Sequence, residues 1–264
     1  MADASGAGMV LVDKEPGPSS FAVVRRVRSR FGLKAGHAGT LDPFASGLLV
    51  LLVGPATRLA RYLVGLDKRY ETTIRLGLRT TTGDPEGDPL EETNVATRDE
   101  IAGLAGAIEL PIPAASAVKI DGERAYRLHR RGVTVEMPTR RSVVHSLDVL
   151  RLDGSELELS LHVSSGTYVR AIADVLGGHC VSLRRTAVGP LRVDDADEEL
   201  LLAPLAAVSH LPREDLSDED ARLVSTGRPL ASATEGAVAL VARGRLVAVG
   251  RGNDGLVRPE TVLS

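Results

Sequence analysis

The segment HAGTLDPFASG, residues 37–47, holds a single carboxylate, Asp42, among residues that favour turns. The following Pro43 biases Asp42 toward extended backbone dihedrals. The same pair also suits the start of a helix, because Asp is a favoured N-cap and Pro a favoured first helical residue. Two compatible interpretations follow: Asp42 caps a helix, or it is presented on a stiff loop as an ionised nucleophile.

Other familiar catalytic signatures are missing. The sequence contains no GxGxxG motif after a strand, no Walker A motif, no HEXXH and no GXSXG. The only cysteine, Cys180, can form neither an internal disulfide nor a cysteine-based zinc site. The histidines are scattered without the spacing typical of metal ligands: His37, His129, His145, His162, His179 and His210. We therefore expect no metal site.

The composition is that of a folded chain with a packed core. Of its 264 residues, 43% are hydrophobic and 25% are charged, which excludes global disorder. No apolar run approaches the length of about 18 residues needed to span a bilayer, and no secretory signal is visible. We expect a cytoplasmic protein without a membrane partner.

Charge is distributed unevenly along the chain, although the net charge is only −3. Residues 1–80 carry 12 basic and 6 acidic side chains, and residues 119–145 carry 7 and 3. Residues 194–220 carry 1 basic and 10 acidic side chains. Because phosphate binding depends on the local field, the basic segments are compatible with a nucleic-acid partner. Ordinary solvated surfaces are the alternative.

Hydrophobic periodicity predicts strands and helices that do not strictly alternate. Strands are expected at 9–13, 48–53, 68–78, 143–152, 155–163 and 179–193, and helices at 21–31, 56–66, 97–107, 123–132 and 167–178. Asp153-Gly154 is a strong hairpin signal, and residues 237–252 form a second hairpin near Arg243-Gly244. Strands that meet in hairpins favour an α+β protein with a central mixed, largely antiparallel sheet flanked by helices.

The segment around Asp42 resembles the catalytic motif of the pseudouridine synthases, in particular the TruB family, which isomerises the uridine in the T loop of transfer RNA. That motif reads GHAGTLDPFASGLLVLLVGPATRLARYL at residues 36–63. Further segments fit the family in the same order: LVDKEPGPSS, DKRYETTIRLGLRTTTGDPEG, ASAVKIDGERAYRLHRRG and VSSGTYVRAIADVLGGHCVSLRRTAVGPL. Together they cover most of the chain up to residue 193.

The resemblance implies roles for individual residues. Asp42 is the catalytic aspartate, Tyr70 packs on the flipped base, and Arg170 pairs with Asp42. Without the resemblance, Tyr70 would be a half-buried core residue and Arg170 a surface charge. Four more residues are implied in the substrate site: Tyr168 and Leu183 in the base pocket, His37 against the RNA, and Lys14 as support of the catalytic loop.

The resemblance also implies an architecture and partners. We expect a pseudouridine synthase catalytic domain at residues 1–213 and a PUA-like, β-rich RNA-binding domain at residues 214–264. The expected substrate is the T arm of tRNA, without cofactor, metal or guide RNA, bound by a monomer. The guide-dependent relatives usually carry basic extensions, which this chain lacks.

Two alternatives stay open. The chain could be a non-catalytic RNA-binding protein, such as a tRNA-folding chaperone of the same fold, or a synthase for a different RNA. The sequence departs from the family pattern at Glu15, where proline is usual, in a shortened stretch between Arg170 and Leu183, and in an abbreviated segment 90–113. These departures affect the geometry of loops and the contacts that the protein would make with RNA, and they leave the catalytic positions intact.

Overall fold

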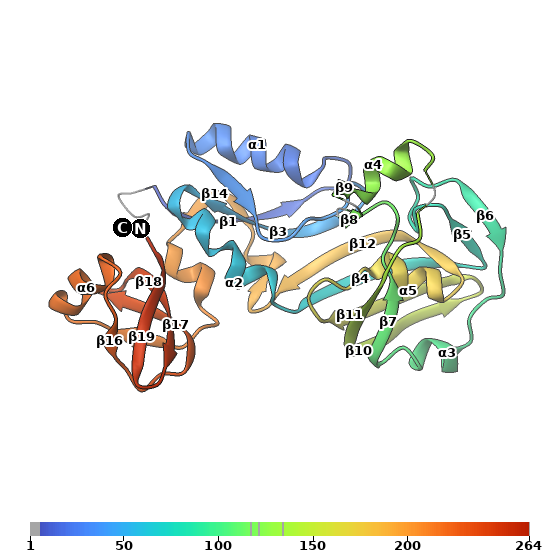
Figure 1. The fold of residues 1–264 in the computed structure, drawn as a ribbon. Helices are drawn as coiled ribbons and strands as arrows, with labels where there is room; N and C mark the ends of the chain where they lie inside the picture. Colours follow the sequence, from blue (N-terminus) through green and yellow to red (C-terminus); the bar gives the residue numbers. More distant parts are fainter. Residues whose placement is uncertain (1–5, 117, 121, 134, 264) are drawn as a thin grey trace.

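A computed structural model describes residues 6–116, 118–120, 122–133 and 135–263. Its main body is a ten-stranded sheet with the path β14-β1-β3-β12-β4-β11-β10-β7, while β2 pairs with β3 and β13 with β12 (Figure 1). The strands are β1 (Gly8–Lys14), β2 (Ala35–His37), β3 (Ser46–Val53), β4 (Lys68–Leu76), β7 (Gly106–Pro111), β10 (Thr139–Asp153), β11 (Glu156–Val163), β12 (Gly178–Val188), β13 (Leu191–Arg192) and β14 (Asp197–Leu202). Only the pair β12–β3 is parallel among the described strands of this sheet. The predicted mixed, largely antiparallel sheet is confirmed.

Helices and short strands surround this sheet. The helical segments here are α1 (Ser20–Phe31), η1 (Gly54–Leu59), α2 (Ala60–Val64), α3 (Arg98–Ala102), α4 (Ala125–Arg130), α5 (Val169–Val175), η2 (Val193–Asp195) and η3 (Pro204–Val208). Two small hairpins complete the main body: β5 (Leu78–Thr80) with β6 (Pro89–Glu92), and β8 (Lys119–Ile120) with β9 (Glu123–Arg124). No described helix is long and apolar enough to cross a membrane.

The sheet is buried on both faces at β1 and β3. Val23 and Val27 of α1 belong to the hydrophobic core on one face. Leu59 and Leu63, from η1 and α2, belong to the core on the other face. Two-sided burial explains why β3 reads as a continuous apolar run. Toward β4 and β11 the outer face is more open to solvent, so β4 alternates mainly between buried and exposed residues and β11 between buried and half-buried ones.

The chain ends in a β-rich part with its own five-stranded sheet (Figure 1). Its elements are β15 (Arg213–Asp215), α6 (Asp218–Ser225), β16 (Leu230–Ala231), β17 (Gly236–Ala242), β18 (Arg245–Asn253) and β19 (Leu256–Val262). A small core of its own includes Val238 and Ala248. Val241 and Val249, however, belong to the core that also holds Leu59 of the main body. The predicted division between residues 213 and 214 stays a prediction.

Local signals predicted some elements well and others poorly. Both predicted hairpins are present, and the second turns at Arg243-Gly244 as expected, with positive φ at both residues. The first turns one position later than predicted, at Gly154-Ser155, because Asp153 itself pairs with Glu156. The single helix expected at 56–66 is instead η1 followed by the short α2. The helix expected at 97–107 ends at Ala102, because Gly103 and Gly106 follow and β7 begins at Gly106 with φ 100°.

Candidate active site

Asp42 lies on the loop that joins β2 to its antiparallel neighbour β3. Residues 43–44 form a bend and β3 begins at Ser46, so Asp42 caps no helix. The Ala45 N–H donates to the Asp42 carbonyl at 3.2 Å, which closes the turn. The Asp42 side chain keeps 32% of its surface exposed. Of the two interpretations of this segment, the structure favours a carboxylate presented on a loop.

Arg170 reaches Asp42 from the first turn of α5. Its Nε donates to Asp42 Oδ2 at 2.9 Å, and its own side chain is only 3% exposed. The guanidinium also donates to the carbonyls of Thr82 at 2.5 Å and Ala115 at 3.1 Å. The predicted proximity of Arg170 and Asp42 is therefore present, across 128 positions of sequence. A buried charge held by this many acceptors has little freedom to move.

A second carboxylate, Asp84, faces the same guanidinium. Its Oδ2 lies 3.4 Å from Arg170 Nη1, and its side chain is 6% exposed. Thr82 Oγ1 and the Glu86 N–H both donate to Asp84 Oδ1, at 2.5 and 3.1 Å. Asp84 falls within the segment DKRYETTIRLGLRTTTGDPEG, to which the sequence analysis assigned no site residue other than Tyr70. One buried arginine thus lies between two carboxylates, of which only Asp42 is substantially exposed.

The apolar candidates lie beside this pair. Tyr70 on β4 is 8% exposed and Leu183 on β12 is 7% exposed. Tyr70 pairs with Arg185 across the two strands and Leu183 with Thr72, so Tyr70 and Leu183 are diagonal neighbours. Both belong to the same hydrophobic core, and Tyr168, two residues before Arg170, packs against it. These residues offer an apolar and aromatic wall of the kind that binds a planar base.

Two buried cationic side chains donate hydrogen bonds to backbone carbonyls of the loop that carries Asp42. Lys14 Nζ donates to the carbonyls of Glu15 at 2.8 Å, Pro43 at 3.1 Å and Ala45 at 2.6 Å. Lys14 is 1% exposed, and this burial lowers its pKa against the opposing attraction of the Asp42 carboxylate. The position of Lys14 fits the support role that the resemblance implied.

Arg185 is the other buried cation, and the sequence analysis did not single it out. Its guanidinium donates to the carbonyls of Leu48 at 2.7 Å, Thr40 at 3.3 Å and Gly39 at 3.1 Å. Arg185 belongs to the segment VSSGTYVRAIADVLGGHCVSLRRTAVGPL, which fits the family, but the resemblance gave this residue no role. Ser20 adds a reciprocal pair of hydrogen bonds to the backbone of Leu41, at 2.7 and 2.8 Å. The loop is therefore fixed on both sides of Asp42.

His37 ends β2, just before the loop of Asp42. Its Nδ1 accepts from the Gly39 N–H at 3.4 Å. Burial, and secondarily the charge of Arg185, lower its pKa. His37 is therefore predominantly neutral at physiological pH. A neutral, half-buried imidazole can contact RNA through hydrogen bonds or stacking rather than through charge.

Comparison with known proteins finds a matching family model and similar chains. The model of the TruB family pseudouridylate synthase N-terminal domain matches residues 25–169, more than half of the chain. A protein of Aromatoleum aromaticum called tRNA pseudouridine synthase B is 40% identical, with 97% of this chain and 92% of that protein covered. A protein of the same name from Thermobifida fusca is 42% identical, with 97% and 98% covered.

Solved structures show the same fold. The crystal structure of a Cbf5-Nop10-Gar1 complex contains a chain that is 25% identical, with a TM-score of 0.73 over 97% of this chain and 85% of that chain. A structure of an H/ACA RNP bound to a substrate RNA containing 2′-deoxyuridine gives the same TM-score at 23% identity, over 98% and 86%. With a matching family model and relatives at 40% identity or more over most of its length, the chain belongs to the TruB family of pseudouridylate synthases.

Proposed function

We propose that this protein converts the T-loop uridine of tRNA to pseudouridine, with Asp42 as its catalytic residue. The observation that carries the proposal is the carboxylate of Asp42, exposed at a fixed loop and held 2.9 Å from the buried guanidinium of Arg170. Relatives named tRNA pseudouridine synthase B support the choice of substrate.

The reaction requires no electron transfer. The N1–C1′ bond of uridine breaks, the base turns, and C5 bonds to C1′. C5 then loses its proton while N1 gains one, so atoms and electrons balance within the nucleotide. An ionised Asp42 can attack C1′ or remove the 2′ proton to form a glycal, and the geometry is compatible with either step. In both, Arg170 orients the carboxylate and stabilises its negative charge.

The surrounding residues would receive the base after it leaves the stack. A base within a folded loop must be flipped out before a side chain can reach its sugar. Tyr70 would pack on the flipped uracil, with Leu183 and Tyr168 completing the wall of the pocket. His37, at the edge of the same loop, would contact the RNA where the base is extruded.

The oligomeric state, the RNA target and the C-terminal part concern the whole chain. We propose that it acts as a monomer on the T arm, without a guide RNA or cofactor. The β-rich part at residues 214–264 would be a PUA-like RNA-binding domain. Its five-stranded sheet and separate core support this assignment.

Tritium release tests the proposal directly. The substrate is an unmodified T-arm transcript that carries 5-tritiated uridine, and the variant is Asp42→Asn, which removes charge and almost no volume. We expect release by the wild type, background release by Asp42→Asn, and similar RNA affinity for both proteins. The wild type should keep its activity in EDTA.

Two outcomes would redirect the proposal. Normal turnover by Asp42→Asn would remove Asp42 from the chemistry. Tight binding of the transcript without any release by the wild type would instead favour an RNA-folding chaperone or a synthase for a different RNA. A transcript in which the target uridine is replaced by cytidine is the control for release from other positions.

A further inference from the structure

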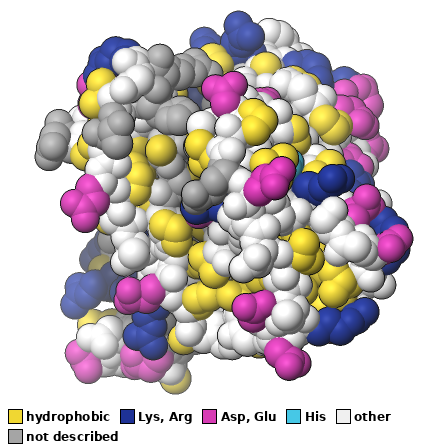
Figure 2. Space-filling model, turned by 90° about the vertical axis from the view of Figure 1, so that its right-hand side faces the viewer, with side chains coloured by type: hydrophobic (Ala, Val, Ile, Leu, Met, Phe, Trp, Pro, Cys, Tyr) yellow, Lys and Arg dark blue, Asp and Glu magenta, His cyan; other side chains and the backbone are white. Residues whose placement is uncertain are grey.

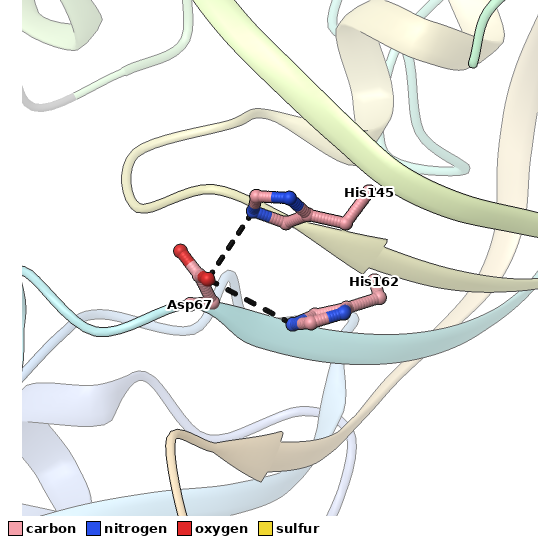
Figure 3. A group of neighbouring side chains, drawn as sticks. All are labelled: Asp67, His145 and His162. Atoms are coloured by element: carbon pink, nitrogen blue, oxygen red, sulfur yellow. Dashed lines mark ion pairs between the residues drawn. The ribbon is translucent and has the colours of Figure 1, made fainter. Parts of the chain in front are cut away.

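Three side chains that can ligate a metal meet at one end of the main sheet, outside the site of Asp42. They are Asp67, which precedes β4, His145 of β10 and His162 of β11 (Figure 3). Asp67 Oδ2 lies 3.2 Å from His145 Nε2 and 3.9 Å from His162 Nε2. The two imidazole centroids are 4.7 Å apart. In Figure 3 the carboxylate faces both rings.

The two histidines lie at a bulge in β10, where this strand pairs with β11. Val144 pairs with Val163 and Ser146 with His162, so His145 is the extra residue between them. A bulge of this kind places two residues opposite one and re-aims a side chain. A regular ladder continued from the Val144–Val163 pair would also place His145 opposite His162, so their proximity comes from the pairing of β10 with β11. The hairpin thus makes neighbours of two histidines 17 positions apart, and the bulge changes the direction of the His145 side chain.

The backbone of Asp67 is also fixed. Its carbonyl accepts from the Gly189 N–H at 2.8 Å. The next residue, Lys68, enters the β4 ladder opposite Val163, and its Nζ donates to the carbonyls of Val64 at 2.7 Å and Leu66 at 2.5 Å. The carboxylate thus projects from a segment that is held on both sides, beside the paired end of β11.

We propose that Asp67, His145 and His162 form a binding site for a divalent transition-metal ion, with Zn²⁺ as the expected occupant. Two imidazole nitrogens and one carboxylate oxygen are a common ligand set for Zn²⁺, and three protein ligands leave one tetrahedral position for water. The same nitrogen-rich set excludes Mg²⁺ and Ca²⁺, which require mainly oxygen ligands.

The distances require only small side-chain movements. The three ligand atoms lie within 4.8 Å of one another. Bonds of about 2.1 Å to a tetrahedral ion would place them about 3.4 Å apart. The side chains are 44% (Asp67), 37% (His145) and 27% (His162) exposed, so rotation about their χ angles can close the gap without moving the strands. An ion could enter directly from solvent for the same reason.

The proposed site lies on the opposite face of the sheet from Tyr70. On β4, Tyr70 is buried in the core while its neighbour Arg69 is exposed, and on β11 Leu161 is buried while His162 is half-exposed. Tyr70 pairs with Leu161 and Arg69 with His162. The ion would therefore take no part in the isomerisation, and it would link the residue before β4 to the middle of β10 and the end of β11.

Binding can be measured on the full chain without a polyhistidine tag. Calorimetric titration with Zn²⁺ should give one ion per chain. Titration with Co²⁺ should give visible absorption bands with the same stoichiometry. We expect His145→Ala, His162→Ala and Asp67→Asn each to weaken binding by more than the roughly tenfold loss that follows when a merely supporting residue is changed. Zn²⁺ should raise the unfolding temperature of the wild type and not that of the variants.

The matched control is His179→Asn. His179 is a half-buried histidine of the same sheet, on β12, and its Nδ1 contacts the Leu78 carbonyl at 2.7 Å. This variant should bind both metals like the wild type. Circular dichroism of each variant checks the fold, and the exposure of the three ligands predicts that the fold persists. Absence of saturable binding, or binding unchanged in the three ligand variants, would show that the cluster is only an ion pair and would overturn the proposal.

Discussion

Arg170 has two carboxylate neighbours with different surroundings. Asp84 is buried and accepts hydrogen bonds from Thr82 and Glu86, whereas Asp42 is one-third exposed. Asp84 is therefore positioned to hold the guanidinium, and Asp42 is open to the solvent, as its proposed role requires. The contact with Arg170 fixes the direction of the Asp42 carboxylate, which is the preorganisation that the proposed catalytic role requires.

The Asp84→Asn variant tests this division of roles. Asparagine keeps the size and one acceptor oxygen for Thr82 and Glu86, but it removes a charge next to Arg170. A hydrogen bond to a charged group contributes about 1.5 kcal/mol or more, so we expect kcat to fall at least about tenfold. RNA affinity should change little. Single-turnover rates and filter binding measure the two quantities, and an unaltered rate would mean that Asp84 does not position Arg170.

Tyr70 can be tested by removing its hydroxyl alone. Tyr70→Phe keeps the ring that would pack on the flipped uracil and removes the group that could assist deprotonation at C5. Proton-transfer groups contribute about 100-fold or more, so we expect the rate of tritium release to fall by about that factor while RNA affinity stays nearly constant. A variant with unchanged rate but lower thermal stability would indicate a role in the core only.

At the scale of elements, the junction between α2 and β4 depends on a buried cation. Lys68 Nζ donates to carbonyls at the end of α2 and lies 3.5 Å from Ser165 Oγ. Burial, and secondarily the charge of Arg185, lower its pKa to about 8. This lysine links the strand that carries Tyr70 to the loop that leads to α5 and Arg170.

The lowered pKa of Lys68 predicts a pH-dependent stability. Between about pH 8 and the ordinary lysine value of 10.5, the unfolded chain binds more protons than the folded chain. The free energy of unfolding therefore gains a contribution that rises with pH across this window. Lys68→Met lacks this contribution. We expect the stability difference, wild type minus Lys68→Met, to increase from pH 8 to 10.5 in urea denaturation. A difference that stays constant with pH would contradict the assignment.

At the scale of the whole molecule, opposite charges lie against each other. Arg26 of α1 pairs with Glu198 of β14 at 2.6 Å, and Arg30 pairs with Glu199. On the end of the molecule seen in Figure 2, basic and acidic side chains are interspersed around hydrophobic ones. The acidic stretch at 194–220 therefore neutralises part of the basic N-terminal region. Exposed pairs of this kind add little stability, and RNA phosphates can compete with them.

The β-rich C-terminal part shares a core with the main body. Val241 and Val249 belong to the same hydrophobic core as Leu59. Tyr62 of α2 adds a hydrogen bond to Thr261 Oγ1 of β19 at 3.1 Å. The two parts therefore stabilise each other, although each also has core residues of its own.

Removal of the C-terminal part should consequently destabilise the remainder. A chain ending after Pro212 would expose the side chains that face Val241 and Val249. We expect its unfolding temperature to fall by more than about 5 °C, as seen by calorimetry, and its rate of proteolysis to rise. If the truncated chain unfolded at the same temperature as the main body does within the full chain, the two parts would be energetically independent.

Some features of this protein follow from the sequence alone. Short-range signals specify α1, with Ser19 and Gly32 as its caps, and the two hairpins, because turns and caps depend on residues that are close in sequence. The motif around Asp42 indicates the family, and it predicts residues of the site that remain to be tested by the variants above. The extent of η1, α2 and α3 was not predictable in the same way, because packing on the sheet and glycine positions outweigh helical periodicity there.

Only the tertiary structure decided which distant groups meet. Asp84 lies beside Arg170, and Arg185 and Lys14 close around one loop, because neighbouring strands of a mixed sheet come from remote parts of the chain. The register of β10 against β11 places His145 beside His162, and a bulge that no local pattern in the sequence marks sets the direction of His145. Spacing along the chain determines local turns and helix faces, whereas contacts between buried charges and ligands arise from strand order and register.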